Sequence, residues 1–152
     1  YFRAAQHVQD YLPMSKRNVI DFEGPSEAFA RAFAEAGVSL EDLGFAEVHD
    51  CFTTAELLSY EAMGLTEKGQ GEIAIKEGWT HADGKLPVNR SGGLKSKGHP
   101  LGATGLSMHA IASMQLTGRA GDLQLDNPKL GAVFNMGGSA VSNYVSILEP
   151  LR

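Results

Sequence analysis

One histidine, His99, lies in a Gly-rich run between Ser91 and Gly105 that leads directly into an apolar, helix-like segment. The unpaired N–H groups and the positive end of a following helix disfavour a cation, so we expect His99 to be neutral. A neutral imidazole can accept a proton from a nucleophile or donate a hydrogen bond to an oxyanion. The alternative is a Gly-rich turn with a hydrogen-bonded histidine. The glycines that would let the backbone approach a ligand closely are Gly92, Gly93 and Gly98.

A second group of reactive side chains is His49-Asp50-Cys51-Phe52, between a predicted strand and a predicted helix. The helix N-terminus would stabilise a thiolate at Cys51 by about 0.3 to 1 kcal/mol, which would suit an acid/base or a nucleophile. A lone cysteine can equally be a small buried hydrophobic residue, and His49 alone can be structural. Asp50 can orient a neighbour or stabilise a helix start. We interpret the remaining histidines as structural: His7, His81 and His109.

Two further features have open interpretations. The loop over residues 135–139 contains Gly137 and Gly138, whose amides could act as oxyanion donors or could only close a hairpin. Positive charge is concentrated before and within the Gly-rich run, which indicates either a site for a phosphate-bearing ligand or a solvated loop. The residues concerned are Lys85, Arg90, Lys95 and Lys97.

Hydrophobic spacing predicts the elements that position these loops. Helices are expected over residues 25–36, over 53–63 with capping-box spacing, and over 104–117. The last of them should bury a face that contains Leu106, Ala110, Ile111 and Met114. A strand is expected over residues 45–48, and a hairpin from residues 130–134 and 140–148. Weaker patterns indicate a capped turn at 39–42, a short helix at 73–76 and a short strand at 87–89.

This alternation predicts an α/β fold, a layered mixed sheet with helices on its faces that ends in a β-hairpin. We expect one domain over residues 25–152, preceded by an arm or loop over residues 1–24. Sites in open α/β sheets collect where loops leave the strand ends. The three loops are therefore expected to meet.

Composition excludes several classes of protein. The 152 residues are 43% hydrophobic and 20% charged, which is typical of a globular fold. With 13 basic and 18 acidic residues the net charge is −5, and no basic stretch is interleaved with aromatics, so we expect no nucleic-acid partner. No apolar run reaches about 18 residues, so we expect no membrane span. Because no signal region is visible either, we expect a cytoplasmic location. One cysteine allows no internal disulfide, and we expect no metal site.

Taken together, these loops resemble the C-terminal half of thiolases, in particular the sterol-carrier or lipid-transfer type of acetyl-CoA acetyltransferases. Residues 88–105 are similar to that family's Gly-His-Pro block, and residues 49–52 to its His-Asp-Cys-Phe block. Residues 11–17, Tyr-Leu-Pro-Met-Ser-Lys-Arg, are also similar to a segment of such proteins. The resemblance therefore covers nearly the whole chain.

The resemblance implies a thiolase-like fold and a role for each residue. His99 would activate a nucleophilic cysteine and bind the thioester oxygen, with His49 beside it in the oxyanion hole. Cys51 would be the acid/base, and Gly137 a backbone donor to a second oxyanion hole. Better-known thiolases carry an acid/base cysteine in a Cys-x-Gly motif, where this chain has Asn135-Met136-Gly137. Cys51 would replace it.

The family places its nucleophile in an N-terminal half that this sequence does not contain. The resemblance therefore implies a partner half, a coenzyme A thioester as substrate, no tightly bound cofactor, and a homodimer or tetramer of the parent enzyme. The chain begins at Tyr1 rather than at methionine, which indicates a piece of a longer protein, and we expect the isolated chain to be inactive.

Two alternatives to thiolytic acyl transfer remain. A retro-aldolase of sterol side-chain coenzyme A thioesters would use the same fold. A non-catalytic lipid or acyl-CoA binding module or assembly subunit belongs to a different class. Ketoacyl synthases also share the fold, but the Gly98-His99-Pro100 sequence fits thiolases better.

Overall fold

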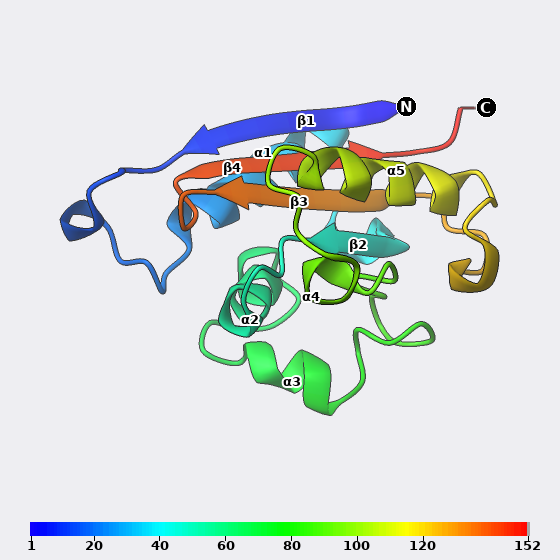
Figure 1. Ribbon diagram of the computed structural model, residues 1–152, viewed down its shortest axis with the longest axis horizontal. Helices are drawn as coiled ribbons and strands as arrows, with labels where there is room; N and C mark the ends of the chain where they lie inside the picture. Colours follow the sequence, from blue (N-terminus) through cyan, green and yellow to red (C-terminus); the bar gives the residue numbers. More distant parts are fainter. Residues whose placement is uncertain (152) are drawn as a thin grey trace.

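A parallel pair of strands, β2 (Phe45–Val48) and β3 (Gly131–Gly137), brings distant parts of the sequence together at one sheet edge. The computed structural model describes residues 1–151. In it β3 pairs antiparallel with β4 (Ser142–Leu148), which pairs antiparallel with β1 (Phe2–Gln9). The sheet order is β1-β4-β3-β2 (Figure 1). The expected mixed sheet with a C-terminal hairpin is confirmed.

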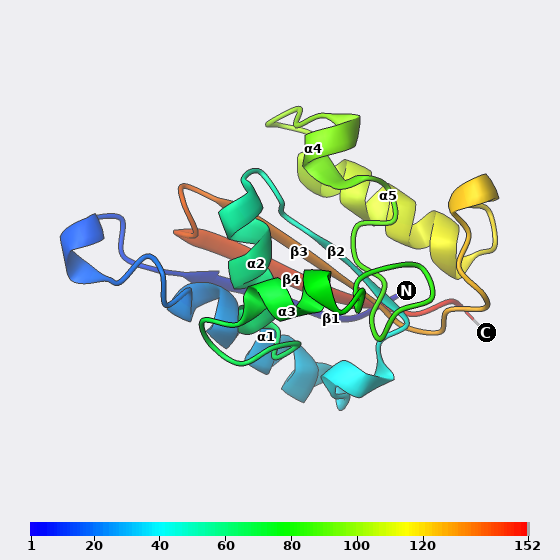
Figure 2. The ribbon, with the colours of Figure 1, turned by 90° about the horizontal axis from the view of Figure 1, so that it is seen from below.

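The two faces of the sheet carry separate hydrophobic clusters, because successive side chains of a strand point to opposite sides. Ala46, Val48 and Phe134 belong to the larger cluster, which packs against α1 (Glu23–Ala36). Phe45 and Val133 belong to the smaller cluster under α5 (Thr104–Leu116). Figure 2 shows α1 and α5 on opposite sides of the sheet.

The helices on the α1 side follow the predicted spacing. In α1, Phe29 and Ala32 are buried, and the helix ends at Gly37 in the left-handed region at φ 64°. Next come α2 (Thr53–Ala62), which packs against α1, and α3 (Gly71–Lys76), which packs against α2. The expected capping box at the start of α2 is wrong. Phe52 is the N-cap residue, without a side-chain cap, and the Glu56 carboxylate instead accepts from the Tyr60 hydroxyl at 2.7 Å.

Shorter elements connect these layers. Three 3₁₀ turns are formed by Met14–Lys16, Leu40–Asp42 and Gly121–Leu123. The capped turn predicted at residues 39–42 is present, since the Asp42 carboxylate accepts from both the amide and the hydroxyl of Ser39 in a capping box. The expected strand at 87–89 is reduced to one parallel bridge, between Val88 and Ala46. A short helix that was not predicted, α4 (Gly93–Lys97), lies inside the Gly-rich run.

Two other expectations are corrected. Residues 2–9 were expected in an arm or loop, but they form β1, which is stabilised by long-range pairing with β4 rather than by a local pattern. Figure 1 shows the following residues, up to α1, projecting beyond the end of the sheet. The prediction of which face of α5 is buried is wrong: Leu106 is 75% exposed, whereas Met108 and Ala112 are fully buried. The division between residues 1–24 and 25–152 otherwise stays a prediction.

Candidate active site

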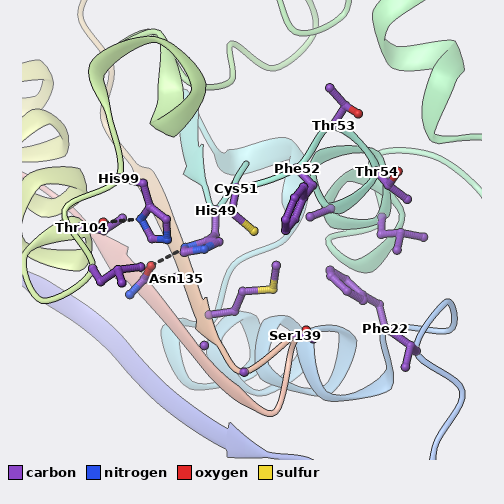
Figure 3. A pocket seen from close by; sticks show the side chains of 17 residues that line it. Phe22, His49, Cys51, Phe52, Thr53, Thr54, His99, Thr104, Asn135 and Ser139 are labelled. Atoms are coloured by element: carbon purple, nitrogen blue, oxygen red, sulfur yellow. Dashed lines mark hydrogen bonds between the residues drawn. The ribbon is translucent and has the colours of Figure 1, made fainter. Parts of the chain in front are cut away.

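The three loops meet around one pocket of about 670 Å³ at the carboxyl ends of β2 and β3. Its lining includes His49, Cys51 and His99, which Figure 3 shows, and also Gly137. The carboxyl ends of parallel strands meet at the same edge of a sheet, and the β2–β3 pairing therefore places residues 49–58 beside residues 135–139. The loop before α5 completes the pocket.

His49 follows β2 directly and is only 5% exposed. Its Nδ1 atom lies 2.7 Å from the Oδ1 atom of Asn135, near the carboxyl end of β3. Burial lowers the pKa of His49, and the nearby His99 ring lowers it further, against an opposing effect of the bond to Asn135. His49 is therefore held as a neutral imidazole at pH 7.

His99 reaches the pocket from the loop before α5 and is exposed. Its ring stands edge-on to that of His49, with centroids 5.0 Å apart (Figure 3). The Nδ1 atom lies 2.7 Å from the Thr104 Oγ1 atom, and the Thr104 hydroxyl donates to the Pro100 carbonyl at 3.0 Å. Thr104 is 2% exposed, so the first residue of α5 fixes this ring from behind.

Cys51 lies just before α2, half-buried, and packs against both hydrophobic clusters. The stabilisation of a Cys51 thiolate that we expected from the helix N-terminus is smaller than the effect of burial. Burial raises the pKa of the Cys51 thiol, and this outweighs the hydrogen bonds from nearby backbone amides. At neutral pH the sulfur carries its proton, which makes Cys51 suited to donate a proton first and to accept one in return.

The buried Asp50 carboxylate attaches α4 to the end of β2. It accepts from the Leu94 amide at 2.7 Å and from the Lys95 amide at 3.4 Å, and the Lys95 ammonium lies 3.8 Å away. Gly93 has a φ of 65°, and a Cβ atom there would lie 2.2 Å from the Asp50 carboxylate. Gly93 therefore allows α4, and with it the loop that carries His99, to lie directly against the sheet.

The three glycines proposed as ligand contacts lie outside the pocket lining. They are Gly92, Gly93 and Gly98. The basic side chains that could have bound a phosphate-bearing ligand do not all lie together. Lys95 pairs with Glu56 and Asp50, and Lys85 lies over the Trp79 ring at 4.7 Å. These positions hold positive charge in structural contacts.

A second buried carboxylate, Glu47, lies within β2 and is 1% exposed. It accepts from the Ser91 hydroxyl at 2.5 Å and from the Ser91 amide at 3.2 Å. Burial raises the pKa of Glu47, against these hydrogen bonds, which lower it. Glu47 thereby connects the Gly-rich run to the sheet, although burying its ionised carboxylate costs free energy of folding.

Glu47→Gln is expected to stabilise the chain increasingly as the pH rises. The folded pKa of Glu47 lies above its ordinary value of 4.5, so the wild type loses stability as the pH rises from 4.5 through the folded pKa. Glutamine has no such ionisation, so the free energy of unfolding of Glu47→Gln should rise relative to that of the wild type across this pH range. Denaturant unfolding of both chains from pH 4 to 8 measures it, and a difference that does not increase with pH would contradict the prediction.

Asn135 and Thr104 are the pocket residues whose contacts sequence reasoning did not identify. In the sequence, Asn135 stands out only because better-known thiolases carry a cysteine at its position, and Thr104 only as the start of a helix. His7 and His109, interpreted as structural, lie outside the pocket lining: His7 stacks on Tyr144, and His109 contacts Gly105 and Ser146.

Within residues 1–151, no group of three or more His, Cys, Asp or Glu side chains is placed to hold a metal ion. Every helix in this part of the chain is too short or too polar to cross a lipid bilayer.

Two known proteins are similar to this chain over nine tenths or more of its length. Acetyl-CoA acetyltransferase from Methanothermobacter thermautotrophicus is 40% identical over 150 residues, which are 98% of this chain and 39% of that protein. Sterol carrier protein 2 from Homo sapiens is 41% identical over 143 residues, which are 90% of this chain and 26% of that protein. The chain thus spans about two fifths or less of these relatives.

A solved structure shares the fold. The Ltp2-ChsH2(DUF35) aldolase superposes with a TM-score of 0.82 over 95% of this chain and 38% of that chain, at 20% identity. Residues 5–150 match the family described as thiolase C-terminal domain-like. With the match extending over almost all of its residues, the chain belongs to the thiolase C-terminal domain-like family.

Proposed function

We propose that this chain is the C-terminal catalytic half of a thiolase-like acyltransferase, which forms or cleaves the Cα–Cβ bond of a 3-ketoacyl-CoA. The observation that carries the proposal is the convergence of two imidazoles and a protonated thiol, from His49, His99 and Cys51, on one pocket. The similarity to an acetyl-CoA acetyltransferase supports this reaction class.

Each group has a chemical role in this proposal. His99 takes the proton of a nucleophilic cysteine, whose thiolate attacks the thioester carbon to form an acyl-enzyme. In cleavage, the Cys51 thiol gives its proton to Cα of the departing thioester, and the resulting thiolate recovers a proton from the attacking coenzyme A; in bond formation the same steps run in reverse. The Gly137 amide stabilises charge on the thioester oxygen. A neutral His49 lies next to His99. Coenzyme A enters as part of the substrate.

The nucleophile must come from other polypeptide, because Cys51 is the only cysteine of the chain. An apolar surface over the pocket lining and α5 supports such a partner: Leu101 is 84% and Phe52 74% exposed in the lining, and Leu106 is 75% exposed in α5. Large exposed apolar patches mark interfaces. We assign this surface to an N-terminal thiolase half, and on this proposal the isolated chain is inactive. The homodimer or tetramer of the parent enzyme stays a prediction.

Cys51→Ala in the full-length parent separates the two steps of the proposed reaction, acyl transfer to the nucleophile and formation of the C–C bond. The variant should retain transfer of an acyl group from acyl-CoA to the nucleophile, because His99 is intact. It should lose about 10² to 10⁴-fold in C–C bond formation, because proton transfer at Cα has no acid/base. Exchange of labelled coenzyme A into acyl-CoA measures the first step, and release of 3-ketoacyl-CoA measures the second. Loss of both steps to the same extent would contradict the assignment of Cys51.

Retro-aldol cleavage is a second candidate, favoured by Asn135 at the position where better-known thiolases carry a cysteine. In that reaction an imidazole takes the proton of a 3-hydroxyl group and the Cα–Cβ bond breaks. Cβ leaves as a carbonyl, and Cys51 protonates Cα. Cleavage of a 3-hydroxyacyl-CoA without added coenzyme A would identify this reaction. Cleavage of a 3-ketoacyl-CoA that requires coenzyme A identifies thiolysis.

A further inference from the structure

The hairpin that joins β3 to β4 contains a strained turn. Gly138, Ser139 and Ala140 have positive φ angles of 63°, 54° and 65° in succession. The Val141 amide donates to the Gly137 carbonyl at 3.0 Å and closes the turn. Residues other than glycine rarely adopt this left-handed conformation, and hairpin loops of four residues are most often built around a type I turn, in which φ is negative. The hairpin therefore needs contacts that enforce this conformation.

The strained turn forms part of the pocket wall. Gly137, Gly138 and Ser139 belong to the pocket lining, whereas Ala140 is 1% exposed and lies outside it. Strained backbone persists only where the surrounding structure enforces it, and it occurs preferentially at functional sites. Because the turn begins directly after Gly137, its conformation determines how this part of the backbone faces the pocket.

One buried side chain, Asn143 on β4, supplies contacts that enforce the turn. It is fully buried, and its Nδ2 atom donates to the Ala140 carbonyl at 2.9 Å. The same atom donates to the Val8 carbonyl at 3.3 Å, which joins the turn to β1. Among residues 1–151, the Oδ1 atom of Asn143 is buried without a hydrogen-bond partner. Only the N–H groups of this amide are used, although an unpaired buried oxygen costs free energy.

The surrounding elements enclose this amide. Gly24 is the second residue of α1, and a Cβ atom there would lie 2.5 Å from Nδ2 of Asn143. The Asp10 amide, which follows β1, donates to the Val141 carbonyl at 2.7 Å and attaches the end of the turn to the same strand. Asn143 therefore lies between β1, α1 and the turn, with little space to move.

We propose that Asn143 is a positioning residue: it holds residues 138–140 in the left-handed turn and so directs the Gly137 amide at the oxygen of the thioester. The inference rests on the proposed function for the role of Gly137 as an oxyanion donor. No bond forms or breaks at Asn143. Its contribution is to fix the donor before the thiolate attacks, because a fixed donor stabilises the developing charge without reorganising during the reaction.

Asn143→Leu in the full-length parent tests the inference, because leucine is similar in size to asparagine but has no N–H donor. Exchange of labelled coenzyme A into acyl-CoA should lose about 10 to 10²-fold in kcat, with KM within a few-fold. Removing an oxyanion donor costs about 10² to 10³-fold, and a displaced donor should cost less. Gly24→Ala keeps Asn143 but displaces its amide, and it should lower the same rate.

A second substitution identifies the cause of the loss. Glycine adopts positive φ without strain, so Ala140→Gly added to Asn143→Leu should recover part of the lost rate. Gln115→Leu is the matched control, because it also removes a buried amide that donates to a backbone carbonyl, that of Leu123 at 2.6 Å. Gln115 lies in α5 outside the pocket lining, so the rate per folded molecule should stay within a few-fold of the wild type.

Amide hydrogen exchange of the same proteins, followed by mass spectrometry, reports on the turn without any activity. The peptide that contains residues 137–142 should exchange faster in Asn143→Leu than in the wild type, and Ala140→Gly should reverse part of this change. An unchanged rate of coenzyme A exchange in Asn143→Leu, or an equal loss in Gln115→Leu, would overturn the inference. If the peptide behaves as stated but the parent catalyses neither thiolysis nor retro-aldol cleavage, the proposed function fails and the role of Asn143 in holding the turn stands.

Discussion

His99→Asn in the full-length parent should lower kcat/KM by about 10⁴-fold or more. The imidazole is proposed both to activate the nucleophile and, once protonated, to stabilise the oxyanion. General acid–base catalysis contributes about 10² to 10⁴-fold, and one oxyanion donor about 10² to 10³-fold. Asparagine is polar and small enough for the space beside Thr104, but it cannot accept the proton of a thiol at neutral pH. Steady-state rates of 3-ketoacyl-CoA cleavage measure the loss.

His81→Asn is a suitable control, because His81 is exposed and lies outside the pocket. It should retain activity within a few-fold. A His99→Asn enzyme with more than a tenth of wild-type activity would contradict the proposed function. That outcome would favour the other class of protein, a non-catalytic lipid or acyl-CoA binding module or assembly subunit.

Gly93→Ala is expected to reduce the free energy of unfolding by about 2 to 5 kcal/mol. An alanine at φ 65° costs roughly 1 to 2 kcal/mol in backbone strain. Its Cβ atom would also occupy the place of the Asp50 carboxylate, 2.2 Å from Oδ2. Because that carboxylate is buried and caps α4, displacing it adds about 1 to 3 kcal/mol for lost hydrogen bonds.

Comparison with Gly118→Ala separates the cost of displacing the Asp50 carboxylate from the cost of backbone strain. Gly118 has a similar φ of 69°, and nothing lies within 4 Å of its Cβ position. This control should cost only the backbone strain, about 1 to 2 kcal/mol. Urea unfolding of the three chains measures both values. Equal destabilisation at the two positions would show that Asp50 does not hold α4 as described.

The sequence predicted the elements whose patterns are local. Strand β2 was expected at residues 45–48 and lies at Phe45–Val48, because a strand between turn residues is recognisable by itself. Helix α1 shows the expected apolar spacing and ends at Ala36, as expected. The meeting of three loops followed from the rule that sites collect at strand ends, together with a resemblance to thiolases.

What the sequence could not predict depends on long-range partners. Strand β1 has no clear alternation and is defined by its pairing with β4, more than 130 residues away along the chain. Helix α5 is apolar on several sides, so spacing could not show which face packs on the sheet. The bond between His49 and Asn135 joins residues 86 positions apart and required the parallel pairing of two strands to be known.

The β2–β3 pairing also determines where this molecule can tolerate change in length. The chain between the two strands includes α3, which lies away from the pocket lining, so insertions there would leave the distance between the reacting groups unaltered. Removing a single residue from β2 itself would turn every later side chain of that strand to the opposite face. The imidazole of His49 would then face the wrong layer, so a longer segment around α3 should preserve the pocket, whereas a change in the length of β2 should destroy it.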